Sequence, residues 1–331
     1  MREGTVYIFK TSPKTLGRDV EKVLNTADFQ DFYPEEETFI KINANYDKDW
    51  PGCNTSRWFL DALLRNLKIR GFENLKAIEG DLKLQPAVKT VKVIGIKDLL
   101  EKHRVPFVPI EGLPRDEYEL PLVLHNSQLI NTAVLHTHTF AVISCATKNL
   151  FGLLPVYREK YHNNLSEKLI ELRERIKNVN CSLFNIIDGT VGLEGGSMRL
   201  GDPKRVDLML AGRDTLAVDK VAAEIMGFSA NDVPLLRLAV KSGLLDLGSV
   251  RAKGDFSDDG DVPRYDFAYK DSKIARFDLW VRRNRLTKAF FDYNRFFDSL
   301  AQRARRKYTA YVYNKKKDTV LKGDWREYLG K

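Results

Sequence analysis

The sequence predicts an α/β fold: a layered, mostly parallel sheet flanked by helices, with a basic helical extension at the C-terminal end. Two observations carry this prediction. Short runs rich in β-branched and aromatic residues alternate with helical patterns along residues 1–247, and Lys and Arg concentrate after residue 272. Alternation at this spacing favours crossover connections, and these pair strands in parallel.

The expected strands are short apolar runs bounded by polar or glycine-containing segments. In chain order they are residues 5–9, 38–43, 75–79, 105–110, 132–139, 182–187 and 206–211.

The expected helices show apolar residues three and four positions apart. The first begins at Asn54 or Thr55 and ends near residue 70, and its apolar positions are Trp58, Leu60, Leu63, Leu64 and Leu67. The others are residues 94–103, 164–177, 215–226 and 231–241. Gly71, Gly227 and Gly243 follow three of these helices as stop signals.

Charge divides the chain into a body (1–247), a polar linker or loop (248–272) and a basic tail (273–331). The tail carries 17 Lys and Arg against 6 Asp and Glu, whereas residues 1–272 carry 37 against 39. One helical face of the tail is apolar, and its members are Leu286, Phe290, Tyr293, Phe297 and Leu300.

Composition indicates a globular protein in a reducing, cytoplasmic setting. Hydrophobic residues make up 43% of the chain and charged residues 30%. No apolar run approaches the roughly 18–20 residues that span a bilayer, and the start MREGTVYIFK has no secretory signal. Cys53, Cys145 and Cys181 lie far apart, so they form neither a disulfide framework nor an iron–sulfur motif.

Polar side chains follow four of the expected strands. They are Lys41 and Asn43, His136 and His138, Asp188, and Arg213 with Asp214. Ligands of open parallel α/β sheets bind beyond the carboxyl ends of the strands. The sequence therefore predicts that these groups share a site at that edge.

His136 and His138 are two residues apart, so both rings lie on the same face of a strand. This arrangement suits a divalent metal or paired contacts to an anion. Two core histidines bonded to backbone carbonyls are the alternative.

Lys148 and Asn149 stand at an expected turn or helix start. A fixed cation there binds a phosphate or carboxylate, or stabilises a developing oxyanion. A surface lysine beside a capping asparagine is the alternative. Arg158 and His162 are four residues apart and share a helical face, with an exposed pair as the alternative.

The segment NIIDGTVGLEGGSMRLGDP is rich in glycine and follows an expected strand. Its Asp188 and Glu194 suit cation binding or general base catalysis, and a flexible turn is the alternative. The segment matches no nucleotide-binding fingerprint. Asp214 is expected to cap the next helix, and Asp219 to face solvent or a neighbouring cation.

The chain resembles the domain-of-unknown-function 362 family over residues 38–228. The resemblance rests on IKIN, PGCNTSRWFLDALL, HTHTFAVISCATKNLFGLLP, YREKYH, NIIDGTVGLEGG and LMLAGRDTLAVDKVAAEIMGF, in this order. It implies a family site at Lys41, Asn43, Thr137, His138, Lys148, Asn149, Arg158, His162, Asp188, Glu194, Asp214 and Asp219.

Two positions depart from the family pattern. His136 replaces the usual lysine before Thr-His, and Ser197-Met198 replaces the usual Gly-Pro after the acidic loop. Members are often fused to a ferredoxin module. This chain has no cysteine cluster, so a redox role would require an electron-donor protein.

The sequence therefore leads to two hypotheses. The first is an enzyme acting on a small anionic metabolite, metal-assisted or of redox or isomerase type. Lys41 and Lys148 would hold the anion, with Asn43, Thr137, Asn149, Arg158, His162 and Asp214 as further contacts. His138, Lys148, Asp188 and Glu194 would carry the catalysis, and His136 and His138 a metal. Hydrolysis is disfavoured because no Ser or Cys has a recognisable nucleophile context.

The second hypothesis is a non-catalytic binding or scaffold protein. Its basic tail would engage a membrane surface, a partner protein or a second subunit. Nucleic acid is the weaker choice because no RNA-binding sheet motif is present.

Overall fold

The structure is a computed structural model that describes residues 4–82, 85–196, 201–256, 262–269, 295–320 and 322–329. Within this part, nine strands form one sheet in the order β4-β3-β2-β5-β7-β8-β1-β9, with β6 added to β5. The strands are β1 Thr5–Lys10, β2 Thr38–Lys41, β3 Leu75–Glu79, β4 Phe107–Pro109, β5 Gln128–His138, β6 Val142–Ser144, β7 Ser182–Glu194, β8 Asp202–Gly212 and β9 Arg251–Gly254.

The predicted α/β class is confirmed, and the sheet is mostly parallel. Strands β4, β3, β2, β5 and β7 run in one direction. Strand β8 runs antiparallel to both β7 and β1, while β1 and β9 are parallel. The carboxyl end of β8 therefore points away from the edge where the parallel strands end.

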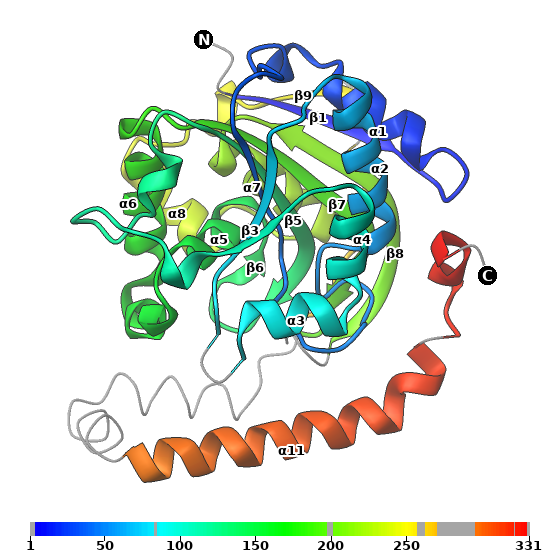
Figure 1. The fold of residues 1–331 in the computed structure, drawn as a ribbon, viewed down its shortest axis with the longest axis vertical. Coiled ribbons are helices and arrows are strands. Elements are labelled where there is room, and N and C mark those ends of the chain that lie inside the picture. The colour runs from blue at the N-terminus through cyan, green and yellow to red at the C-terminus, as the bar shows by residue number, and fades with distance from the viewer. Residues whose placement is uncertain are drawn as a thin grey trace.

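Helices cover both faces of this sheet (Figure 1). The α-helices are α1 Leu16–Leu24, α2 Arg57–Ile69, α3 Ala87–Val93, α4 Ile96–Lys102, α5 Ala146–Leu150, α6 Leu165–Asn178, α7 Thr215–Met226, α8 Pro234–Lys241 and α11 Arg295–Val320. The 3-10 turns are η1 Ala27–Phe29, η2 Ile110–Gly112, η3 Leu122–Leu124, η4 Phe151–Leu153, η5 Val156–Asn164, η6 Leu247–Ser249 and η7 Asp324–Leu329.

Two buried clusters lie on opposite faces of the sheet. The cluster under α5, α6 and α7 includes Leu135, Ile187 and Leu169, and the cluster under α1 and α2 includes Ile186 and Phe59. Neighbouring residues of β7 enter different clusters because successive side chains of a strand point to opposite faces.

The helix signals in the sequence are confirmed at α7. The Asp214 side chain accepts a hydrogen bond from Leu216 N at 2.8 Å, and Gly227 ends the helix at φ +95°. At α2 the expected start is early by one or two residues, because Ser56, and not Asn54 or Thr55, is the N-cap. The Ser56 hydroxyl supplies the oxygen that accepts a hydrogen bond from a backbone N–H at the start of the helix.

Two expected loops contain strand. The segment 248–272 was expected to be a linker, but residues 251–254 form β9 and pair with β1. The glycine-rich segment was expected to leave the sheet after residue 187, but β7 continues to Glu194 and turns at Gly195 and Gly196, whose φ angles are positive. Ser197 and Met198 lie outside the described residues.

The tail contains the predicted helix, described from residue 295 as α11 along one side of the body (Figure 1). Most of the predicted apolar face from Leu286 to Leu300 lies outside the described residues. In the described ranges, every helix is too short or too polar to cross a lipid bilayer.

Candidate functional site

Two neighbouring strands, β2 and β3, end in a buried ion pair. Lys41 Nζ lies 2.8 Å from Glu79 Oε1, and both side chains are almost inaccessible to solvent. Lys41 Nζ also donates to the Ile42 carbonyl at 2.6 Å, while Ala44 N and Gly80 N donate to the Glu79 carboxylate. Burial lowers the pKa of Lys41, and the Glu79 charge opposes that shift. Both side chains of this pair therefore have hydrogen-bond partners besides each other.

Lys148 on α5 and Arg158 in η5 bring two more cations to the pair. Burial, together with the charges of Arg158 and Lys41, lowers the pKa of Lys148 to about 7, and the charge of Glu79 opposes that shift. Arg158 is buried and donates to the Leu154 carbonyl at 3.1 Å. Three cationic groups therefore surround one carboxylate at the end of β3.

Two glycines allow this close approach. A Cβ atom on Gly80 would lie 2.3 Å from the Gly152 carbonyl oxygen, and one on Gly152 would lie 2.8 Å from Lys41 Nζ. Both distances are shorter than any side chain tolerates. The bare backbone at these positions lets η4 rest directly on the ends of β2 and β3.

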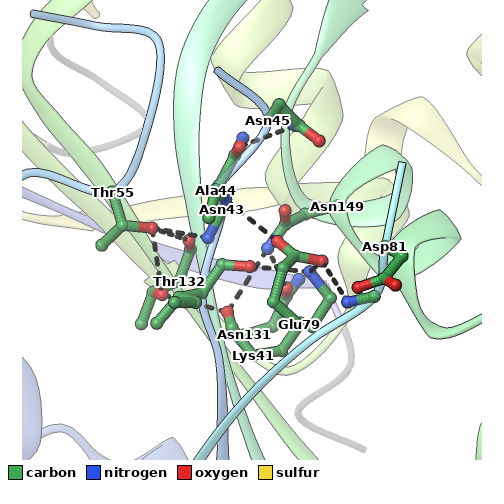
Figure 2. Close-up of polar contacts among 12 residues, drawn as sticks. Lys41, Asn43, Ala44, Asn45, Thr55, Glu79, Asp81, Asn131, Thr132 and Asn149 are labelled. Carbon is green, nitrogen blue, oxygen red and sulfur yellow. Dashed lines mark hydrogen bonds and ion pairs between the residues drawn. The ribbon is translucent and has the colours of Figure 1, made fainter. Parts of the chain in front are cut away.

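A row of asparagine amides holds α5 on the sheet. Asn149 Nδ2 donates to Asn131 Oδ1, and Asn131 Nδ2 donates to Asn185 Oδ1, both at 2.8 Å. Asn185 Nδ2 donates in turn to the Gly212 carbonyl at 3.0 Å. Asn149 also donates to the Lys41 carbonyl at 3.4 Å, so its amide positions α5 beside Lys41 (Figure 2).

Threonines brace the loop after β2 (Figure 2). Asn43 N donates to Thr55 Oγ1 at 2.8 Å, Thr55 Oγ1 donates to the Thr132 carbonyl, and Thr132 Oγ1 donates to the Lys41 carbonyl. The Asn43 side chain accepts from Asn45 Nδ2 at 2.6 Å. The expected contact residue Asn43 therefore lies at the same strand end as Lys41.

A cavity of about 250 Å³ lies beside Lys148. Its apolar wall comes from β6, α6 and α8 and from the segment between β5 and β6, and includes Phe140, Ile143, Leu165, Leu169, Val233 and Leu235. Its polar wall includes Cys145, Lys148, His162, Asn163, Asp219 and Arg237.

Asp219 on α7 is buried, not solvent-facing as the sequence suggested. Its Oδ2 accepts from Thr147 N at 3.1 Å, whereas its Oδ1 has no hydrogen-bond partner among the described residues. Burial raises the pKa of Asp219 to about 6. The cavity thus has a cation on α5 and an incompletely bonded carboxyl on α7.

The two strand histidines are buried near this edge. His136 Nδ1 lies 3.3 Å from the Thr137 carbonyl, and burial together with the Lys148 charge lowers the His136 pKa to about 4. His138 Nδ1 accepts from Phe140 N at 3.1 Å. Within the described part of the chain, no three His, Cys, Asp or Glu side chains are grouped as metal ligands. The tentative metal pair therefore gains no third ligand there.

Thr137 and Glu194 form contacts at the turn between β7 and β8. Thr137 Oγ1 accepts from Gly196 N at 2.7 Å, and Glu194 forms an ion pair with Lys204 at 3.0 Å. Glu194 also accepts from Ala268 N. These contacts hold the turn against the end of β5.

Asp188 lies on the other face of the sheet from Lys41. Lys41, Asn131 and Asn185 are paired in register, and Asp188 follows Asn185 by three residues. Its oxygens accept from Ser56 N at 2.9 Å and from Thr190 Oγ1 at 2.7 Å. Burial raises the Asp188 pKa, and these donors oppose the shift.

Of the four predicted strands, the structure brings β2 and β5 together beside Lys148, through Lys41 and His136, and it does not bring Asp188 on β7 or Asp214 after β8 to the same place. Asp214 follows the antiparallel β8, caps α7 and pairs with Arg173 at 2.8 Å. Lys41, Lys148, Asn149 and Arg158 do come together. The expected exposed alternatives for Lys148 and Arg158 are wrong, since the first is half-buried and the second buried.

Sequence reasoning missed Glu79, Asn131 and the burial of Asp219. The signal for Glu79 was present: it ends the buried strand LKAIE as Lys41 ends TFIK. Charged residues at adjacent strand ends are natural partners once the strands are paired in parallel.

The model of a family described as a domain of unknown function, DUF362, matches residues 38–224. The chain belongs to this family. The match contains Lys41, Glu79, Lys148, Arg158 and Asp219 and ends within α7.

A thylakoid-associated protein of Synechocystis sp. is 28% identical over 124 residues. The matched segment covers 35% of this chain and 37% of that relative, so the likeness is partial on both sides. No solved structure matches the chain significantly.

Proposed function

We propose that the protein is an enzyme that binds a small anionic metabolite, a carboxylate or a phosphate, in the cavity beside Lys148. The supporting observation is the excess of cations at the end of β3. Lys148 is acted on by the charges of Lys41 and Arg158 and by a single carboxylate, Glu79.

Buried charge of one sign is costly, and its repulsion falls when an opposite charge is bound. Lys41 is already paired with Glu79, whereas Lys148 Nζ forms no hydrogen bond or ion pair with the described residues and lies 4.4 Å above the Phe151 ring. Lys148 is therefore the cation best placed to receive an anion. Its half-buried side chain lines the cavity.

The residues that line the cavity also favour a catalytic role over binding of the anion alone. His162 and Asp219 line the cavity together with Lys148, and burial raises the pKa of the Asp219 carboxyl to about 6, where it can give or take a proton near neutral pH. This set suits proton transfer on a bound anion, so an isomerase-type or lyase-type reaction is favoured over hydrolysis. A metal at His136 and His138 and an external electron donor remain proposals of lower rank. The reducing, cytoplasmic setting proposed from the sequence fits three free, buried cysteines.

Anion binding is tested by calorimetry with sulfate, phosphate and pyruvate on the full chain. We expect saturable binding that Lys148→Gln weakens about tenfold or more, as for loss of a hydrogen bond to a charged group. Sulfate affinity should fall as pH rises through about 7, because Lys148 then loses its proton.

The matched control is Lys97→Gln, which removes an exposed lysine paired with Glu101 on α4. It should leave all three affinities unchanged. Absence of saturable binding by the unmodified protein, or equal effects of the two substitutions, would refute the proposal.

The tail supports a second candidate, a binding role at a membrane surface or partner protein. Arg303, Lys307 and Lys315 of α11 are exposed, and the Synechocystis relative is described as thylakoid-associated. The end of the tail, however, packs on the body: Val320 is buried, and Tyr313 lies 5.5 Å from the Trp50 ring. Deleting residues 295–331 should therefore lower the unfolding temperature, and loss of binding to anionic vesicles would support the second role.

A further inference from the structure

Lys41 and Lys148 lie in one charged cluster but differ in their bonding. Lys41 is held by Glu79 and the Ile42 carbonyl. Lys148 Nζ lies over the Phe151 ring and lines a cavity with apolar walls. An amine in such a place is free to react, whereas a paired ammonium is not.

We propose that Lys148 is a nucleophile that forms an imine with the carbonyl group of a small oxo acid bound in this cavity. The inference deepens the proposed function and rests on it, since the oxo acid is the anionic metabolite. It adds the substrate class and a covalent step.

The step balances without an oxidant or reductant. The uncharged Lys148 amine adds to the carbonyl carbon, and the resulting carbinolamine loses its hydroxyl as water to leave a carbon–nitrogen double bond. A proton must reach the departing hydroxyl, and another must leave the nitrogen. Asp219 and His162 stand in the cavity wall for these transfers.

The charge environment favours the uncharged amine at neutral pH. The charged groups acting on Lys148 come from three elements: Lys41 on β2, Glu79 on β3 and Arg158 in η5. Asp219 on α7, His162 in η5, Glu167 on α6 and Arg237 on α8 line the cavity from the remaining sides. With a pKa of about 7, half of Lys148 is uncharged at that pH.

Arg158 and Lys41 then supply the fixed positive field for the carboxylate of the oxo acid. Lys148 would then supply the reactive amine, while the Lys41 ammonium paired with Glu79 and the Arg158 guanidinium would supply the positive charge. The same logic activates lysines near other cationic groups.

The first experiment traps the imine. The full chain is incubated with pyruvate or glyoxylate and sodium cyanoborohydride, and the modified residues are mapped by mass spectrometry. We expect modification at Lys148 at least about tenfold above that at Lys97, as the larger uncharged fraction requires. Lys148→Arg should abolish this modification, since a guanidinium stays protonated and forms no imine.

The second experiment needs no matching substrate. Competitive labelling with trace acetic anhydride between pH 6 and 10 measures each lysine's free amine. Lys148 should reach its maximum rate near pH 8, well below the pH at which a lysine of ordinary basicity does so, and Lys97 is labelled in the same sample for comparison. A Lys148 profile that follows Lys97 would overturn the inference, even if one of the oxo acids is trapped weakly.

The outcomes separate the two proposals. Sulfate binding without a trapped adduct and without early labelling would overturn the imine step and leave the anion site standing. No anion binding, with early labelling retained, would overturn the proposed function while leaving a reactive lysine.

Discussion

On the α5 side of the sheet, Glu79 is surrounded by Lys41, Lys148 and Arg158, and Lys148 faces a cavity. On the α2 side, Asp188 is also buried, but backbone and hydroxyl donors from Ser56 and Thr190 surround it. Both regions bury a carboxylate at similar depth. They differ in how that charge is balanced: by cations in excess on one side, and by neutral donors on the other.

This difference indicates which of the two buried charged regions is suited to bind a ligand. Neutral donors are fixed by the fold and leave Asp188 complete. Excess cations leave a net charge that an incoming anion reduces. The α5 side is therefore the side on which we place the proposed anion site, although both faces carry residues expected at the site.

The largest effect should follow from Glu79→Gln. Removal of this carboxylate leaves Lys41 buried without its counter-ion and exposes it to Lys148 and Arg158. We expect the free energy of unfolding to fall by about 3–5 kcal/mol, as for broken buried pairs. Urea unfolding measures this value.

The matched control for that substitution is Glu37→Gln, which breaks a half-exposed pair with Lys76. It should cost about 1 kcal/mol or less. Similar costs at the two positions would mean that the Lys41–Glu79 pair is not electrostatically special.

A smaller effect is expected from Asp188→Asn on the α2 side. The amide keeps one acceptor but presents a donor to Ser56 N or to Thr190, so one hydrogen bond is lost. The free energy of unfolding should fall by about 1–3 kcal/mol. Anion affinity at the cavity should be unchanged, and a tenfold loss of sulfate binding would contradict the separation of the two faces.

The smallest effect concerns pH and Asp219. Its folded pKa of about 6 lies above the ordinary aspartate value of 3.8, so the folded protein binds more protons between these two values. Stability should therefore fall as pH rises from about 4 to about 6, and this contribution is fully present only below the unfolded pKa. Asp219→Asn should remove that part of the slope in urea unfolding measured at each pH. An unchanged slope would show that Asp219 titrates normally.

Much of the fold could be predicted because local signals decide it. Asp214 and Gly227 bracket α7 as their residue types require, and the amphipathic pattern of α6 places its helix within one residue. The glycine-rich segment misled for a physical reason: Gly189 and Gly192 allow close backbone approach inside a strand, and only Gly195 and Gly196 make the turn.

The site could be predicted in part. Lys41 and Lys148 follow from strand ends and a helix start, but the direction of β8 depends on pairing between distant segments, which periodicity does not report. Asp188 was misplaced because its strand is longer than its apolar run, so the side chain belongs to the interior of β7. Glu79 was overlooked because a single charge at a strand end becomes informative only beside its neighbour.

The contact between Gly80 and Gly152 limits the access of water to the buried charge cluster. With no side chain at either position, two main-chain segments pack directly against each other over Lys41, and a methyl group would not fit between them. A substitution such as Gly152→Ala would separate these two segments and admit solvent to the lysines. Water would then screen their repulsion, and Lys148 would regain the basicity of an ordinary surface amine.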